Sequence, residues 1–223
     1  RKVIHRSWSF TEELVVAVFV LITLLAAALA CCAFTFLLGG GPVEMILAFL
    51  CAGIGNVIRT KLIKHNFTLF LNIAVSISCS CLLYSILLKL AEILFHVSAL
   101  HEAGYICSIL FIIPGFPFIT SGIDLSKLDL RSGLERLSYS IIIVLVATMT
   151  AWIMALLLHL QPLNFTARNL DPILLLILRL LTSFCGVFGF SIMFNSPVKM
   201  AAIAAVMGAL SNTLRLELVD LIG

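Results

Sequence analysis

Runs of apolar residues fill most of this chain and are separated by short polar, glycine or proline breaks. Most runs are close to the roughly 20 residues that an α-helix needs to cross the hydrocarbon core of a bilayer. The pattern predicts an all-α polytopic membrane protein with about seven transmembrane helices. The predicted spans are residues 14–38, 43–58, 67–88, 104–123, 132–160, 172–194 and 198–214.

The composition supports a membrane protein and limits its partners. Hydrophobic residues make up 62% of the chain and charged residues 11%, whereas soluble domains carry about a quarter charged residues. The 14 Lys and Arg against 11 Asp and Glu are too small a basic excess for a nucleic-acid-binding protein. The seven cysteines lie in apolar runs without zinc or redox spacing, so we interpret them as packing residues.

The fourth span contains a break. Pro114-Gly115 and then Pro117 interrupt it, and prolines at these positions would deprive the carbonyls of Leu110 and Ile113 of their helical partners. Non-helical backbone at membrane depth is tolerated only where it is buried in protein or lines a water-filled cavity. Secondary transporters use such broken helices to build substrate sites, although a simple proline kink is the alternative.

The connections between spans predict the side of the membrane that each one faces. Pro42 opens a helix after three glycines, and Ser132 with Glu135 fits a capping box that starts the fifth helix. With the basic N-terminus in the cytoplasm, the positive-inside rule holds. The basic residues on the inner side are then Arg1, Lys2, Arg6, Arg59, Lys61, Lys64, Lys127, Arg131 and Arg136.

A short sequence recurs 155 positions along the chain. Pro42-Val43-Glu44-Met45 with Gly53 is repeated as Pro197-Val198-Lys199-Met200 with Gly208, and a Phe-rich span precedes each copy. A repeat of five spans inverts the second copy, which places Glu44 outside and Lys199 inside. We therefore divide the chain into residues 1–160, a first five-helix repeat, and residues 161–223, a loop with the first two helices of a truncated second repeat.

The broken span and the polar run after it carry a family resemblance. Pro114-Gly115, Asp124-Leu125 and the sequence Ser-Gly-Leu-Glu-Arg at 132–136 follow three spans and precede a fifth. This arrangement resembles the threonine/serine exporter family over residues 8–160. The chain departs from the family at Leu128-Asp129-Leu130, where Gly-Asp is common.

The resemblance implies a secondary transporter of ten spans, in one chain or two, in the bacterial cytoplasmic (inner) membrane. Family substrates include threonine and serine and, in a two-subunit branch, the dicarboxylate succinate. The implied driving force is the proton motive force. The expected partners are a small-molecule substrate, protons, the lipid bilayer and a possible second subunit or oligomer; no cofactor, metal or nucleic acid is expected.

Several polar groups near the break are candidates for substrate binding. The carbonyls of Leu110 and Ile113 can accept hydrogen bonds from an ammonium group, and Thr120 and Ser121 can pair with a hydroxyl. Asp124 lies next to the break, where it either carries a proton or forms a solvated cap at the inner end of the helix. The candidate substrate site therefore includes Pro114, Gly115, Pro117, Thr120, Ser121 and Asp124.

Three further polar residues lie inside predicted spans. Arg179 either reaches outward to the interface or faces a carboxylate, and an intramembrane charge is a functional candidate. Asn56 and Asn212 occupy late positions in the two related helices, where they form either symmetric polar contacts for transport or helix–helix hydrogen bonds.

Other classes of protein fit the sequence less well. A serine protease would need Ser121 near His159, yet these residues are predicted near opposite faces, so we do not expect an enzyme. A channel or structural membrane subunit is the rival that the sequence leaves open. The His and Glu residues after the third span lack a recognised metal-ligand spacing, and we interpret them as an interfacial loop: Glu92, His96, His101 and Glu102.

Overall fold

The computed structural model describes residues 2–95, 104–160 and 170–222, and every regular element in these ranges is a helix. Six helices are long and apolar enough to cross a membrane, and a bent pair forms a seventh candidate span, which confirms the predicted fold class. The elements are α1 (Lys2–Leu37), α2 (Pro42–Lys64), α3 (Leu69–Phe95), α4 (Gly104–Ser108), the 3-10 helix η2 (Leu110–Ile112), α5 (Gly115–Ser126), α6 (Leu130–Leu158), α7 (Pro172–Met193) and α8 (Val198–Ile222).

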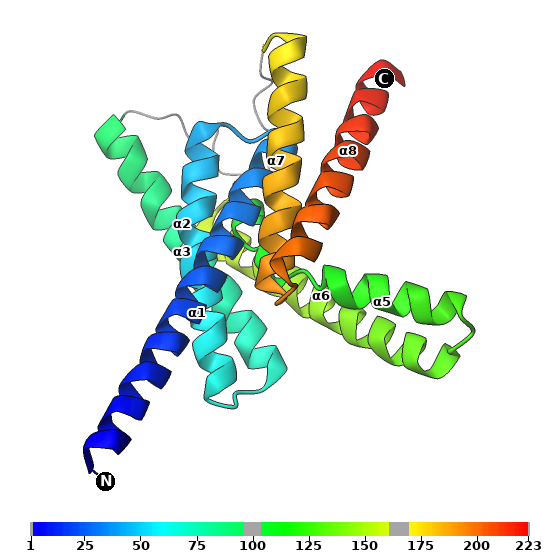
Figure 1. Ribbon diagram of the computed structural model, residues 1–223. Coiled ribbons are helices and arrows are strands. Elements are labelled where there is room, and N and C mark those ends of the chain that lie inside the picture. The colour runs from blue at the N-terminus through cyan, green and yellow to red at the C-terminus, as the bar shows by residue number, and fades with distance from the viewer. Residues whose placement is uncertain (1, 96–103, 161–169, 223) are drawn as a thin grey trace.

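The long helices of the bundle run in alternating directions (Figure 1). In this view α1 runs upward and α2 downward, whereas α7 runs downward and α8 upward. α1 is central, because both α2 and α7 pack along it, and α8 packs on α7. α5 and α6 form a hairpin that projects sideways from the bundle, and α6 also packs on α3.

Several helices extend beyond the ends that hydropathy predicts. α2 continues past residue 58 to Lys64, so Arg59 is a helical residue, and Lys61 and Lys64 occupy the last turn. Cations are favourable there because the helix carbonyl end carries partial negative charge. α3 continues to Phe95 and α8 to Ile222. The apolar pattern ends earlier than the helices because a helix that leaves the hydrocarbon can continue with polar residues.

The start of α6 differs from the predicted capping box at Ser132. Asp129 is the N-cap, and its side chain accepts a hydrogen bond from the Ser132 amide at 3.3 Å. Glu135 pairs with Arg131 at 3.3 Å instead of completing a capping box. Aspartate caps helices as well as serine does, so the turn at Leu128, with φ of 62°, starts the helix two residues earlier.

Small residues bring the helices of the core into close contact. A Cβ at Gly55 of α2 would lie 2.8 Å from the ring of Phe111 in η2 and would overlap the hydroxyl of Ser80 in α3. A Cβ at Gly189 of α7 would lie 2.6 Å from the carbonyl oxygen of Ala26 in α1. Close backbone approach of this kind is typical of packed membrane helices. All seven cysteines are free and none is exposed, in accord with packing roles.

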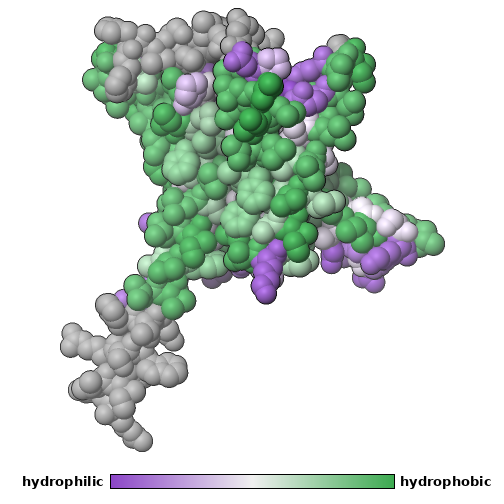
Figure 2. Space-filling model, turned by 45° about the horizontal axis from the view of Figure 1, so that its top comes forward, coloured by the Kyte–Doolittle hydropathy of each residue, from purple (hydrophilic) through white to green (hydrophobic). Residues whose placement is uncertain are grey.

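Most of the visible surface is apolar (Figure 2). Hydrophilic residues gather at the free end of the α5–α6 hairpin and around the ends of α7 and α8 farthest from the turn that joins them. Only 17% of the apolar window of α7, and the same share for α8, is buried inside the chain. Lipid or further protein must therefore cover these two helices in a membrane.

Candidate functional site

The fourth span is broken at the position that the sequence indicates. α4 and η2 (104–112) are followed by α5, whose axis is bent from theirs by 56°. Pro114 is the N-cap of α5, with φ of −82° and ψ of 61°, and nothing lies within 4 Å of a Cβ placed on Gly115. The break combines a residue that cannot continue the helix with open space on one side of the backbone.

The carbonyls at the break have different partners from those expected. Leu110 accepts from the amide of Ile113 at 3.1 Å, and Ile113 accepts from the amide of Gly115 at 2.9 Å. The carbonyl that reaches another helix is that of Phe111, which accepts a 3.0 Å hydrogen bond from Nη1 of Arg59 on α2. The tight turn satisfies the first two carbonyls locally, so the expectation that they are free for substrate is wrong for this conformation.

Pro117 does not interrupt the span a second time. It is the third residue of α5, within the first turn. The amide groups of a first turn have no intrahelical acceptor, so a proline there costs no hydrogen bond. The expected second break is therefore absent from the helix, and α5 continues unbroken to Ser126.

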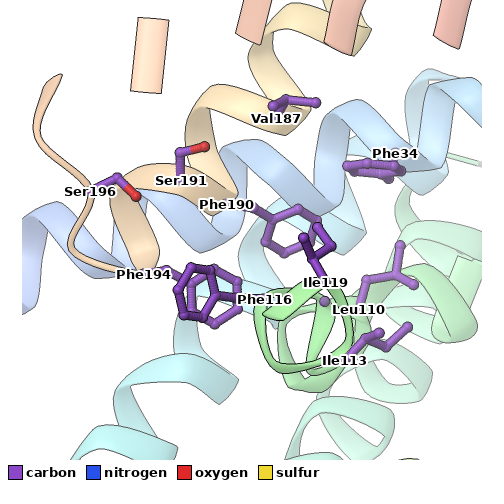
Figure 3. A pocket seen from close by; sticks show the side chains of 11 residues that line it. Phe34, Leu110, Ile113, Phe116, Ile119, Val187, Phe190, Ser191, Phe194 and Ser196 are labelled. Atoms are coloured by element: carbon purple, nitrogen blue, oxygen red, sulfur yellow. The ribbon is translucent and has the colours of Figure 1, made fainter. Parts of the chain in front are cut away.

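A cavity of about 390 Å³ lies beside the break, between η2, the start of α5 and the end of α7 (Figure 3). Its walls are mostly aromatic and aliphatic, and Phe116 of α5 stacks on Phe194 with ring centroids 6.2 Å apart. Two serines add hydroxyl groups. The lining residues are Phe34, Leu110, Ile113, Gly115, Phe116, Ile119, Val187, Phe190, Ser191, Phe194 and Ser196.

A second cavity of about 330 Å³ lies on the α6 side of the break. Pro114, Tyr105 and Trp152 are among its lining residues, and Leu110 and Ile113 line both cavities. Both volumes fall within the few hundred Å³ typical of small-molecule sites. The backbone at the break therefore separates two cavities, each large enough for a small-molecule substrate.

The hydroxyl groups of α5 bond to their own helix. Thr120 Oγ1 donates to the carbonyls of Phe116 and Pro117, each at 3.1 Å, and Ser121 Oγ donates to Phe118 at 2.7 Å. Both oxygens keep lone pairs that can accept a further hydrogen bond. Thr120 and Ser121 follow the break by one to two turns, on the segment that leaves the bundle.

Asp124 lies inside α5 and not in a connection. Its Oδ2 is 3.0 Å from Nη1 of Arg136 on α6, and its side chain is 21% exposed. The ion pair joins the two helices of the hairpin near its polar end. Asp124 is neither a solvated cap nor an unpaired buried carboxylate, because Arg136 compensates its charge.

Arg179 faces carboxylates. Its guanidinium lies 2.7 Å from Glu217 and 2.7 Å from Asp220, both on α8. The cavity-lining residue Phe190 follows Arg179 by 11 positions on α7, about 16 Å along the helix. Arg179 therefore connects α7 to α8 at a distance from the break.

Asn56 and Asn212 both make helix–helix hydrogen bonds. Asn56 on α2 donates to the carbonyl of Thr23 on α1 at 3.0 Å, and Asn212 on α8 donates to Ser183 Oγ on α7 at 2.8 Å. The predicted site residues thus divide into three groups: Pro114 and Gly115 at the break, four residues along α5, and the two separate contacts of Asn56 and Arg179.

Two charged residues of α2 contact other parts of the chain, whereas the sequence indicated only the side of the membrane that each one faces. Glu44 is fully buried in the first turn of α2, against Gly41 and Gly104. Arg59 donates a hydrogen bond to the Phe111 carbonyl at the break. A periodic signal was present, because Glu44, Ala48, Gly55 and Arg59 recur at the spacing of one helical face.

Neither the expected interfacial loop nor the serine–histidine pair yields an alternative site. His96, His101 and Glu102 lie outside the described residues, and no group of His, Cys, Asp and Glu in the described ranges could hold a metal ion. Ser121 and His159 lie near opposite ends of the hairpin, roughly 30 Å or more apart along α6. Proton transfer between them is excluded at that distance.

A family model described as "Putative threonine/serine exporter" matches residues 18–158. The match begins at residue 18, about halfway along α1, and includes α2, α3, the break, α5 and all of α6. No curated protein and no solved structure matched the chain.

Proposed function

This chain belongs to the threonine/serine exporter family, and from this premise we propose that it exports threonine or serine across the cytoplasmic membrane of a bacterium. The observation that carries the proposal is the broken fourth span, bent by 56° beside a cavity of about 390 Å³. Carriers of small polar solutes build their sites at such breaks. We propose that the proton motive force drives export.

Rocking of two inverted repeats around the break is the transport motion that we propose. The hairpins α1–α2 and α7–α8 run in opposite directions (Figure 1), as an inverted repeat requires. Gly53 of α2 faces α1, and Gly208 of α8, 155 positions later, faces α7. In this proposal residues 1–160 form the first repeat and residues 161–223 begin the second.

Hydroxyl oxygens and backbone at the break would recognise the substrate. The lone pairs of Thr120 and Ser121 accept from the ammonium or hydroxyl group, and Pro114 and Gly115 shape the backbone. We propose that Asp124 exchanges its ion pair with Arg136 for a proton during the cycle. Asn56 and Arg179 hold helix pairs together through the contacts described above.

Flux from proteoliposomes tests this function. The full-length protein is reconstituted, labelled threonine or succinate is loaded inside, and efflux is followed with and without an imposed pH gradient. The proposal predicts threonine efflux that accelerates with an inward proton gradient. Efflux of succinate alone would move the protein to dicarboxylate export, and efflux indifferent to the gradient would favour a channel.

A further inference from the structure

Arg59 brings a positive charge to the break from the neighbouring helix. It lies 17 residues after Pro42 on α2, about 26 Å along the helix and hence in the inner half of the membrane. Side chains on a helix lean toward its N-terminus. The half-buried guanidinium accordingly reaches back from this position and donates to the carbonyl of Phe111.

This charge has no acidic partner in the described ranges of the chain. The ion pairs there involve Arg131, Arg136 and Arg179 as cations, and none includes Arg59. By contrast, Arg179 on α7 has two carboxylates at 2.7 Å. Arg59 instead donates a hydrogen bond to a backbone carbonyl.

By donating to the Phe111 carbonyl, Arg59 caps the C-terminal end of η2, but this role does not explain why the donor is charged. The C-terminal end of a helix carries about half a negative charge, which leaves a guanidinium only partly compensated. A neutral donor would satisfy the Phe111 carbonyl equally well. Unpaired charges inside a membrane are expensive and are typically retained for a functional partner. Arginine presents five N–H donors in a fork that fits a carboxylate, and the Phe111 carbonyl occupies one of them.

We propose that Arg59 binds the carboxylate group of the exported substrate at the inner side of the break. The inference rests on the exporter function proposed above and names the substrate group that the site recognises. The Phe111 carbonyl holds the guanidinium in place, and its remaining donors receive the carboxylate. Threonine, serine and succinate all carry a carboxylate, so Arg59 would bind amino-acid and dicarboxylate substrates in the same way.

Ligand-dependent thermal stability tests this proposal without requiring transport. The melting temperature of the purified full-length protein is measured in detergent against L-threonine, L-threoninamide, succinate and succinamide. We expect at least one carboxylate to stabilise the wild type at a concentration about tenfold or more below that of its amide. Arg59→Gln abolishes this preference, and Arg59→Lys keeps the preference at weaker affinity. Arg131→Gln, at a side chain that is 91% exposed, is the control and leaves it unchanged.

Three results would overturn the assignment: equal stabilisation by acid and amide in the wild type, an Arg59→Gln variant that retains the preference, or stabilisation by phosphatidylglycerol alone. The last result would assign Arg59 to a lipid phosphate. Should Arg59→Gln not fold by gel filtration, loss of the preference in Arg59→Lys overturns the proposal and its retention supports it. If the carboxylates bind with the expected preference but the protein transports no substrate, only the proposed export is wrong. If the protein transports substrate but shows no preference for the carboxylate, only the proposed role of Arg59 is wrong.

Discussion

At the scale of single residues, glycines distinguish tight helix contacts from open space. Gly55 lies where α2, α3 and η2 meet, and a methyl group there would collide with Phe111 and Ser80. Gly122 on α5 has nothing within 4 Å of a Cβ. The two positions therefore separate the effect of packing from the general effect of replacing glycine in a helix.

We predict that Gly55→Ala destabilises the protein by about 1 to 3 kcal/mol, because the core must shift to admit the methyl group. Gly122→Ala is neutral or slightly stabilising, since alanine favours helix. Thermal unfolding in detergent measures both variants. Equal melting temperatures for the two variants would show that η2 does not pack on α2 as described.

Asp124 carries the second prediction at this scale. Asp124→Asn removes the proposed proton-binding group and also the charge that pairs with Arg136. We expect proton-driven export to fall by about tenfold or more, while exchange of substrate without a pH gradient persists. The control is Glu135→Gln, which removes a 70% exposed carboxylate from the same hairpin. Unimpaired proton-driven export by Asp124→Asn would exclude Asp124 from coupling.

The identity of a residue predicted its effect on the local backbone better than it predicted the residues that contact its side chain. Pro114 and Gly115 marked the break correctly, because proline and glycine act on the local backbone. The contacts of Arg59 and Glu44 depend on which helices pack against α2, and counting charges gave only the side of the membrane that each one faces. The acidic partners of Arg179 come from α8, a tertiary contact that spacing along the chain does not reveal.

At the scale of elements, the broken span and its hairpin form the unit most closely tied to the proposed function. Hydropathy predicted the existence of each span, while helix ends differed at α2, α3, α6 and α8. The bend of 56° and the sideways projection of α5 and α6 could not be read from the sequence. Proline forbids a continuous helix but does not set the direction of the next one.

Pro114→Ala and Pro117→Ala form a matched pair at this scale. Pro114→Ala supplies an amide that can bond to the Leu110 carbonyl and lets α5 continue the line of α4 and η2. We expect flux per reconstituted protein to fall by about tenfold or more because the site geometry changes. Pro117→Ala lies in the first turn of α5 and changes flux less than about twofold. Equal flux for the two variants would contradict a specific role for the break.

At the scale of the whole molecule, the family match extends over the first five candidate spans, whereas α7 and α8 follow it in the chain. α7 packs on α1. The repeat in the sequence predicts the relative direction of these helices but not that they are in contact. Both helices expose small residues at this contact, Gly189 against Ala26 and Ala30. The sequence shows that such residues can approach closely, and the fold determines which helices they join.

The opposite directions of the two hairpins predict the sidedness of four turns. In a full-length protein without native cysteines, we expect an impermeant maleimide to label Leu38→Cys from the periplasmic side. We expect His65→Cys, Lys127→Cys and Lys199→Cys to react only once the cytoplasmic side is open, since the predicted topology places their turns at the inner face. Labelling of Leu38→Cys and Lys199→Cys from the same side would contradict the inverted arrangement.

Efflux from intact cells measures the proposed export itself. Cells that express the full-length protein are loaded with labelled threonine and, in parallel, with labelled succinate, and release is followed with and without a protonophore. We expect threonine release to be faster than from empty cells and to collapse when the proton gradient is removed. Release no faster than from empty cells, for threonine and succinate alike, would contradict the proposed export.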